Sequence, residues 1–228
     1  MTAPRHRTGK RLYLLMAVAL LLLPIKLLLN LRPNPWLDVP VADTSPAREL
    51  TPPCPWREPE NDLKTFFPGA TRYAPEERIL SERRLELKRR LGRQPTGEDL
   101  LLRLNRVYRD EAPLGSVLTR RVKGQSGAIE IVLLVTEDGP VQGLRLQGLR
   151  EPAPISAAVQ NPEWLGSFKG LSASSDLRLG QEIPDVAPQA RPSAEAVVEA
   201  VRTLLILMDT SRASNIEHLH RSAQMRRD

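Results

Sequence analysis

The most constraining feature of this sequence is a pair of apolar segments separated by a turn. Residues Ala128 to Val135 are β-branched and almost continuously apolar, whereas Pro140 to Gln147 alternate between apolar and polar types. Between them, Glu137-Asp138-Gly139 is typical of a turn. The pattern predicts a β-hairpin whose first strand is buried on both faces and whose second strand is partly exposed.

A short helical turn is predicted after the hairpin, between Asn161 and Gly170. Trp164, Leu165 and Phe168 are spaced so that they share one face of such a turn. Gly170 is a typical residue to end it. This cluster of large side chains is expected to pack against the hairpin.

The order of motifs in this region resembles the FMN-binding domain family. The resemblance rests on a Ser-Gly start at Ser126, a strand, an acidic-Gly turn, a second strand containing Gly, the pair Glu151-Pro152, and Trp-Leu-x-x-Phe-x-Gly ending at Gly170. It extends over about Phe66 to Met208, and Phe-Pro-Gly-Ala before residue 71 resembles the start of some members. The family includes the G subunit of the Rnf complex, the C subunit of the Na⁺-translocating NADH:quinone reductase and the regulatory flavoprotein of nitrous oxide reduction.

The resemblance implies an α+β domain, here expected over residues 63–208, with a small antiparallel sheet and packed helices. It also implies FMN as cofactor and a role in electron transport. In the family, a loop before the last helix reads Asp-x-x-Ser-Gly-Ala-Thr-x-Thr-Ser, and its first Thr carries FMN through a phosphoester bond. The positions of this chain that align with Ser-Gly-Ala-Thr-x-Thr are Pro188, Gln189, Ala190, Arg191, Pro192 and Ser193.

This degenerate flavinylation motif changes the chemistry that the resemblance implies. Arg191 stands at the acceptor position, and a guanidinium has no oxygen to esterify, so covalent FMN is excluded there. Ser193 is predicted to be the N-cap of a helix that runs to Met208, which leaves its hydroxyl a poor substitute. The buried stripe of that helix is predicted to be Val197, Val198, Val201, Leu204, Leu205 and Met208.

Two hypotheses for the pocket remain. In the first, Arg191 and the amino end of the helix hold an FMN phosphate noncovalently, and the resemblance places Glu151, Trp164 and Phe168 near the flavin ring. In the second, the pocket is vestigial and the domain is a scaffold. The second is favoured, because Gln189 stands where the family has glycine and lacks the backbone freedom that a phosphate loop uses.

The amino-terminal part of the chain predicts a membrane anchor. Residues 1–11 form a basic tail, and residues 12–31 are apolar over about 30 Å of helix, enough for one bilayer core. The positive-inside rule places the tail in the cytoplasm and the domain on the periplasmic or extracytoplasmic side. A cleaved signal peptide is the alternative, but the apolar run exceeds the usual length of about 7 to 15 residues.

A proline-rich tether is predicted over residues 32–62. Eight prolines lie between Pro33 and Pro59, too many for a helix or a central strand. Apolar residues in this segment would lie either along a partner or on the domain itself; they are Trp36, Leu37, Leu50 and Trp56. The single cysteine, Cys54, cannot form an intramolecular disulfide, and an inert thiol is favoured.

The remaining segments predict two further helices and a polar tail. Helices are expected from Pro75 to Gly92, with its acids first and bases last, and from Thr96 to about Tyr108. Leu177 to Leu179 would form a short strand. Residues 209–228 would form a polar, basic tail that is either a partly helical extension or a segment that binds a partner.

Several function classes are disfavoured by composition. Four of the 33 basic residues precede Leu12, so the rest of the chain carries 29 basic and 27 acidic residues. The basic clusters within the domain are interleaved with acids, so a solvated face, or docking on a partner or on anionic headgroups, is favoured over nucleic-acid binding. His6, His218 and His220 are the only histidines, and no Gly-x-Ser-x-Gly motif is present, so neither a metal site nor serine-hydrolase catalysis is expected.

The sequence therefore predicts a single-pass membrane protein that is an accessory subunit of a respiratory or photosynthetic electron-transport complex. Integral membrane subunits and the bilayer are its expected partners, and it has no independent catalytic activity. An electron-transfer subunit with noncovalent FMN is the first alternative. A membrane adaptor or assembly factor is the second.

Overall fold

A computed structural model of the chain describes residues 54–224, with side chains as far as Ala213. The predicted basic tail, the membrane-spanning helix and most of the tether lie outside the described residues. None of the helices in the described part is both long and apolar enough to cross a bilayer.

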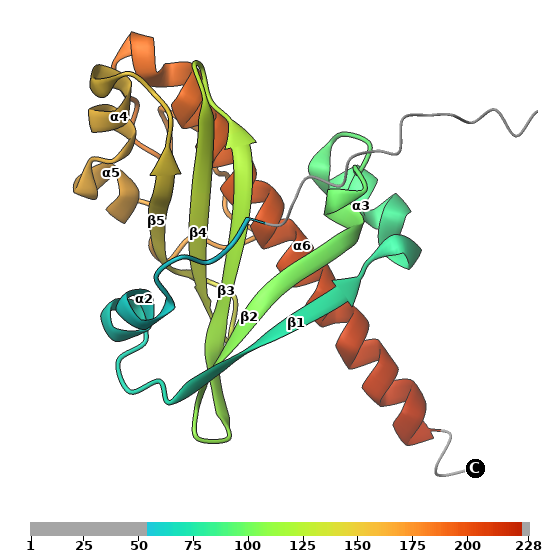
Figure 1. Ribbon diagram of the computed structural model, residues 1–228. Coiled ribbons are helices and arrows are strands. Elements are labelled where there is room, and N and C mark those ends of the chain that lie inside the picture. The colour runs from blue at the N-terminus through green and yellow to red at the C-terminus, as the bar shows by residue number, and fades with distance from the viewer. Residues whose placement is uncertain (1–53, 225–228) are drawn as a thin grey trace, which may run out of the picture. The chain divides into compact units, whose positions relative to one another are not determined.

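The centre of the domain is one antiparallel sheet whose strands follow chain order (Figure 1). The strands are β1 (Arg72–Ile79), β2 (Leu101–Arg109), β3 (Ala112–Lys123), β4 (Ala128–Thr136) and β5 (Val141–Leu149). Helices pack on both faces of this sheet. The predicted α+β class, with a small antiparallel sheet and packed helices, is confirmed.

The predicted hairpin is formed by β4 and β5. Every residue from Ile129 to Val135 is buried, whereas β5 alternates between buried and partly exposed positions. Gly139 lies in the turn with a φ of 117°, a conformation that other residues rarely adopt. Strand β4 is buried on both faces because a helix covers each side of the sheet. Its almost continuously apolar sequence predicts this burial.

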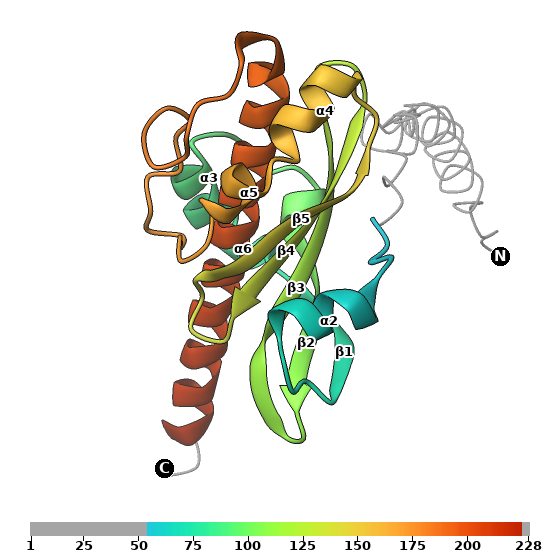
Figure 2. The same cartoon turned by 90° about the vertical axis from the view of Figure 1, so that its left-hand side faces the viewer.

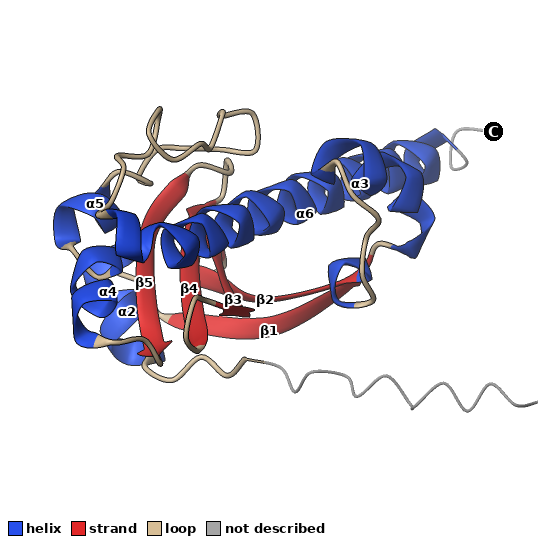
Figure 3. Cartoon of the chain, turned by 90° about the horizontal axis from the view of Figure 1, so that it is seen from above, coloured by secondary structure: helices blue, strands red, loops and turns tan. Residues whose placement is uncertain are grey.

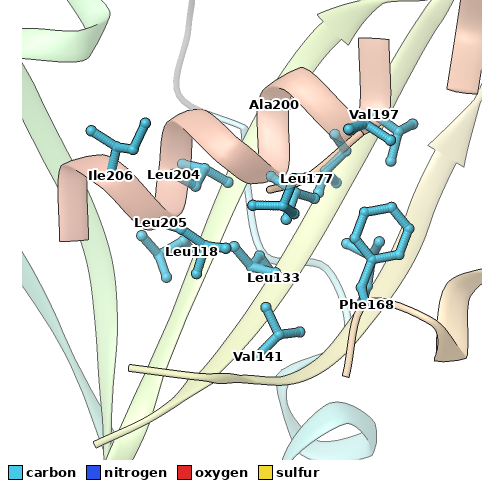
Figure 4. Packing of buried hydrophobic residues seen from close by; sticks show 14 of the residues in the cluster. Leu118, Leu133, Val141, Phe168, Leu177, Val197, Ala200, Leu204, Leu205 and Ile206 are labelled. Atoms are coloured by element: carbon cyan, nitrogen blue, oxygen red, sulfur yellow. The ribbon is translucent and has the colours of Figure 1, made fainter. Parts of the chain in front are cut away.

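The long helix α6 (Arg191–Gln224) crosses one face of the sheet (Figures 1 and 3). All six residues of its predicted apolar stripe are buried. Figure 4 shows Leu204 and Leu205 of α6 against Leu118 and Leu133 of the sheet. The helix continues past Met208 into the predicted tail, as far as Gln224.

The opposite face of the sheet is covered by α2 (Pro59–Phe66; Figure 2). The buried residues of this smaller core are Phe67, Val107, Val117, Val132 and Leu134. Asp62 of α2 is 1% exposed and accepts hydrogen bonds from Arg145 at 2.6 and 2.7 Å and from the Trp56 indole at 2.6 Å. This paired carboxylate fixes the helix on the sheet, since a buried charge is tolerated only with such partners.

The segment from Cys54 to Arg57 is held across the sheet. The Thr119 hydroxyl donates to the Cys54 carbonyl at 2.6 Å, and the Gln147 side chain donates to the Pro55 carbonyl. Arg57 pairs with Glu130 at 2.9 Å.

Trp56 and Cys54 of this segment both contact the domain itself. Trp56 packs on the domain itself, with its ring 5.0 Å from that of Tyr73. The other three apolar residues predicted in the tether lie outside the described residues. Burial raises the pKa of the Cys54 thiol, which agrees with an unreactive cysteine because the thiolate is the nucleophile.

The prediction of a helix from Pro75 to Gly92 is wrong for the first half of this segment. Residues up to Ile79 form the edge strand β1, which pairs along its whole length with β2. An edge strand tolerates Pro75 because one side of its backbone has no partner. A 3₁₀ turn, η1 (Ser81–Arg83), then leads into α3 (Arg84–Leu91), which ends as predicted at Gly92 in the left-handed conformation.

The helix predicted from Thr96 to Tyr108 is also wrong. Its capping signal does form: the Asp99 carboxylate accepts from the Thr96 amide, and the Thr96 hydroxyl accepts from the Asp99 amide. Only the single 3₁₀ turn η2 (Glu98–Leu100) follows, because Leu102 and Leu104 alternate and bury one face of β2 instead.

The segment after the sheet contains two short helices and a loop. They are α4 (Ala153–Val159) and α5 (Pro162–Gly166). The predicted turn around Trp164 is confirmed, with Gly170 at a φ of 82°. The predicted strand at Leu177 to Leu179 is wrong, since only an isolated bridge joins Leu179 to Ile183.

Candidate functional site at the start of α6

The joint before α6 differs from its prediction in one decisive respect. A 3₁₀ turn, η3 (Pro188–Ala190), leads directly into α6, whose first residue is Arg191. Ser193 therefore lies within the first turn of the helix and is not its N-cap. Its side chain is completely buried, which removes its hydroxyl from solvent.

The Ser193 hydroxyl bonds to groups from two other parts of the chain. Its hydroxyl donates to Glu151 Oε1 at 2.8 Å and accepts from the Gln125 amide at 2.9 Å. The same carboxylate accepts from the Ser126 amide at 3.0 and 3.2 Å. The β3–β4 turn, the segment after β5 and α6 are joined at this one carboxylate.

The hydrogen bonds at Glu151 favour its charged form. Burial would raise the pKa of this carboxyl group, but the bonds from Ser193, Ser126 and Gly127 outweigh burial and lower the pKa. Glu151 is therefore ionised at neutral pH. A second anion placed beside Ser193 would be repelled by this charge.

The β3–β4 turn leaves no room beside the carboxylate. A Cβ atom at Gly124 would collide with Glu151 Oε1 and would lie 3.0 Å from Ser193 Oγ. A Cβ atom at Gly127 would collide with the Arg150 carbonyl. Glycine is required at both positions because the turn is packed against Glu151, Ser193 and the Arg150 carbonyl.

Arg191 lies on the surface and has two acidic partners. Its side chain is 48% exposed, and it pairs with Asp185 at 2.9 Å and Glu195 at 3.0 Å. The hydrogen bond that Arg191 donates to Glu195 and the charge of Asp185 raise the pKa of the guanidinium. Two carboxylates around one guanidinium give a net negative cluster, which disfavours an added phosphate.

Trp164 and Phe168 are packed in the main core. They are 4% and 0% exposed, and their rings meet edge to face at 5.2 Å. The Trp164 indole donates to the Pro184 carbonyl at 3.0 Å. Figure 4 shows Phe168 directed toward the cluster beneath α6. Neither ring presents a face on which a flavin could stack.

The structure thus divides the five residues singled out from the sequence into three places. Glu151 and Ser193 bond to each other, Trp164 and Phe168 pack together in the core, and Arg191 pairs with acids at the surface. Among these five residues the one hydroxyl, that of Ser193, is buried, and the carboxylate bonded to it, that of Glu151, is ionised. The five residues therefore do not fit an FMN phosphate.

A second polar centre was not anticipated from the sequence. Asp99 is completely buried and accepts from Arg93 at 2.6 Å and from Arg120 at 2.9 Å. Burial would raise the pKa of Asp99, but the hydrogen bonds from Arg93 and Thr96 and the charge of Arg120 hold it well below its usual range. The Thr96 capping signal was visible in the sequence, but its two arginine partners come from other elements.

A cavity of about 270 Å³ lies close to this centre, between β2 and β3. Pairing of the two strands stops at Asn105 and Val117, and beyond this point they diverge. Leu204 and Leu207 of α6 contribute to its lining. It is separate from the five predicted site residues, none of which lines it.

Among the described side chains, no cluster of three or more His, Cys, Asp or Glu residues could hold a metal ion. No protein-family model matches the sequence. No curated protein matches it either.

Among solved structures, the crystal structure of Shewanella oneidensis NqrC is similar to this chain. The TM-score is 0.44 and the identity 14%, and the match covers 66% of this chain and 88% of that chain.

Proposed function

We propose that this chain is an accessory subunit of a respiratory or photosynthetic membrane electron-transport complex, with an FMN-binding-type domain that serves as a scaffold without flavin. The family resemblance in the order of motifs supports the type of complex. The predicted single-span anchor supports an extracytoplasmic position for the domain, next to integral membrane subunits.

The observation that carries the flavin-free proposal is the hydrogen bond between Ser193 and Glu151. It uses the one hydroxyl that aligns with a Thr of the family motif to join α6 to the rest of the domain. A buried hydroxyl with both a donor and an acceptor partner is costly to release. The joint therefore has a structural role, which is what a scaffold requires.

An electron carrier with noncovalent FMN is the rival proposal. It would require Arg191 to leave Asp185 and Glu195 for the phosphate, and the ring would need a face that Trp164 and Phe168 do not offer. Both changes would break contacts that the structure contains, namely the ion pairs of Arg191 and the packing of the two rings in the core. The geometry therefore favours the scaffold.

The absorbance spectrum of the purified, detergent-solubilised full chain tests the proposal. The scaffold predicts a colourless protein whose spectrum and tryptophan fluorescence do not change when FMN is added. Flavin bands near stoichiometry, or saturable quenching by FMN, would overturn it. Denaturation before the measurement separates covalent from noncovalent flavin, because only the former stays with the polypeptide.

The partners are tested separately by copurification from membranes. We expect integral membrane subunits that carry redox cofactors to accompany the chain in mild detergent. If the accompanying membrane proteins carry no cofactor, the chain is an adaptor or assembly factor outside any redox system.

A further inference from the structure

One exposed surface of the domain combines aliphatic and cationic side chains. We define the α3 surface as Ile79, Arg84, Leu85, Lys88 and Arg89. Ile79 and Leu85 are 78% and 80% exposed, the most exposed of the large hydrophobic residues noted in the described part. The three basic residues are also exposed. Two aliphatic side chains left in water within six positions of each other in the chain, one of them beside Lys88 and Arg89, indicate a surface with a partner.

Helical spacing places the four α3 residues of this set together, while Ile79 is the last residue of β1. Arg84 and Lys88 are four residues apart, as are Leu85 and Arg89, so all four share the outer side of α3. The opposite side is anchored by Leu87 and Leu91, which are buried. Figures 1 and 3 show α3 beside α6, at the other end of the sheet from α4 and α5. The surface is therefore held rigidly and lies far from the joint at Ser193.

The cations of the α3 surface lack the acidic partners that their neighbours have. Within the described residues, Arg84, Lys88 and Arg89 form no ion pair. By contrast, Arg90 pairs with Asp209 at 2.8 Å, and Arg93 pairs with Asp99. The nearby acids add little negative charge: Glu86 already pairs with Arg90 and Arg83, and the exposed Glu82 leaves the surface net positive.

We propose that the α3 surface docks on the anionic headgroups of a lipid bilayer. Exposed cations gain electrostatic attraction near such a surface, and flanking aliphatic residues can enter the interface. Both kinds of group are present here on one helix.

The length of chain ahead of the described part argues for a bilayer as the occupant. The predicted anchor ends at Leu31, so 22 residues separate it from Cys54. At about 3.1 Å per residue in an extended proline-rich conformation, they reach no further than about 70 Å. The anchor therefore keeps a bilayer surface within reach of the domain. This inference uses the predicted anchor but is independent of flavin.

A fluorescent probe at position 85 tests the proposal in the full chain. Cys54 is first replaced by Ser, and Leu85→Cys is labelled with an environment-sensitive dye after reconstitution into vesicles. We expect the emission to shift to shorter wavelength in vesicles that contain phosphatidylglycerol and to remain unshifted in pure phosphatidylcholine. Salt at about 0.5 M should reverse the shift, because it screens surface charge.

A matched pair of triple variants tests whether the three cations of the α3 surface cause the emission shift. Each basic residue near an anionic surface contributes about a fivefold preference, so Arg84→Gln, Lys88→Gln and Arg89→Gln together should abolish the shift. The control changes three other exposed lysines, Lys64→Gln, Lys123→Gln and Lys169→Gln, which lie on α2, β3 and the segment after α5. It removes the same charge and should leave the shift intact.

Three outcomes would overturn the proposal: no shift in anionic vesicles, an equal loss in both triple variants, or a shift produced by soluble polyglutamate but not by vesicles. The last would indicate an acidic protein partner. Retention of the chain in vesicles after alkaline carbonate washing is measured in parallel. Failure of the anchor would appear there, whereas failure of docking would leave a retained protein with an unshifted probe.

Discussion

Charged side chains have partners at the first turn of α6 but lack them on the α3 surface. Around α6, Glu151 is satisfied by Ser193 and backbone amides, and Arg191 by two carboxylates. On the α3 surface, three cations without ion pairs among the described residues and two aliphatic residues face solvent. The residues that the family resemblance singles out are paired or packed within this domain. The surface available for recognition lies elsewhere.

The difference shows how a basic cluster in a sequence can be interpreted. Arg90, Arg120 and Arg121 belong to clusters that look similar to Arg84 and Arg89 in the sequence, yet each pairs with an internal carboxylate or with one on a packed neighbour. Paired cations stabilise the domain, and unpaired ones are free for a partner. The following variants test that division, from the largest expected effect to the smallest.

Asp99→Asn should have the largest effect, because it leaves Arg93 and Arg120 without their shared buried carboxylate. Breaking a buried ion pair on one side costs about 3 to 5 kcal/mol, so the free energy of unfolding should fall by that order in urea titrations followed by tryptophan fluorescence. Asp176→Asn, at an exposed ion pair with Arg178, is the control and should change little. Equal effects of the two variants would contradict the assignment.

The effect of Asp99→Asn should also depend on pH. The folded-state pKa of Asp99 is lowered, so its stabilising contribution is fully present above the unfolded-state pKa of about 4 and is lost as the pH falls further. The difference between wild type and variant should therefore be constant from pH 6 to about 5 and shrink below about pH 4. If the difference in unfolding free energy between wild type and variant grew on acidification, the pKa of Asp99 would be raised in the folded state and not lowered.

Ser193→Ala should have an intermediate effect. It removes the donor to Glu151 and the acceptor for the Gln125 amide, at a cost of about 1 to 3 kcal/mol for groups left unsatisfied. Unfolding in urea measures the loss, and Ser174→Ala at an exposed hydroxyl is the matched control. A Ser193→Ala protein of unchanged stability would mean that the joint is not held by this bond.

Arg191→Gln should leave the midpoint of urea unfolding almost unchanged. Its ion pairs with Asp185 and Glu195 are solvent-exposed, and such pairs contribute little to stability. If Arg191 instead held a phosphate, the same variant would abolish FMN binding. A titration of wild type and variant with FMN therefore decides between a surface charge and a ligand-binding one.

The triple Gln variant of the α3 surface should have the smallest effect on stability. Arg84, Lys88 and Arg89 have no ion pairs to lose within the described residues, so unfolding midpoints should match those of the lysine control. The two variants should differ only in vesicle docking. A marked loss of stability in the α3 variant would instead assign these cations to the fold.

The parts of the fold that the sequence predicts correctly are those with strong apolar patterns. The β4–β5 hairpin, the stripe of α6 and the turn at Trp164 each carry enough buried side chains to specify their own conformation. β1 and β2 lack such a pattern, and their charged residues are equally compatible with a helix. Only the pairing of the two segments with each other makes them strands. β3 was not anticipated, since its Pro, Gly and Arg residues obscure the alternation that its neighbours impose.

The candidate site was predictable only in part for a similar reason. That Arg191 cannot be esterified follows from its side chain alone. The partnership of Ser193 with Glu151 joins residues 42 positions apart, and no local pattern reports a contact over that separation. The α3 surface was visible as a basic cluster, but only the folded chain distinguishes its unpaired cations from the paired ones.

The segment from Cys54 to Arg57 is fastened to three strands, to β3 through Thr119, to β4 through Glu130 and to β5 through Gln147. A force applied at Cys54 is thereby distributed over three strands at once. Displacing the segment would break hydrogen bonds to β3, β4 and β5 together, so its path across the sheet is specified by several elements that lie far apart in the sequence.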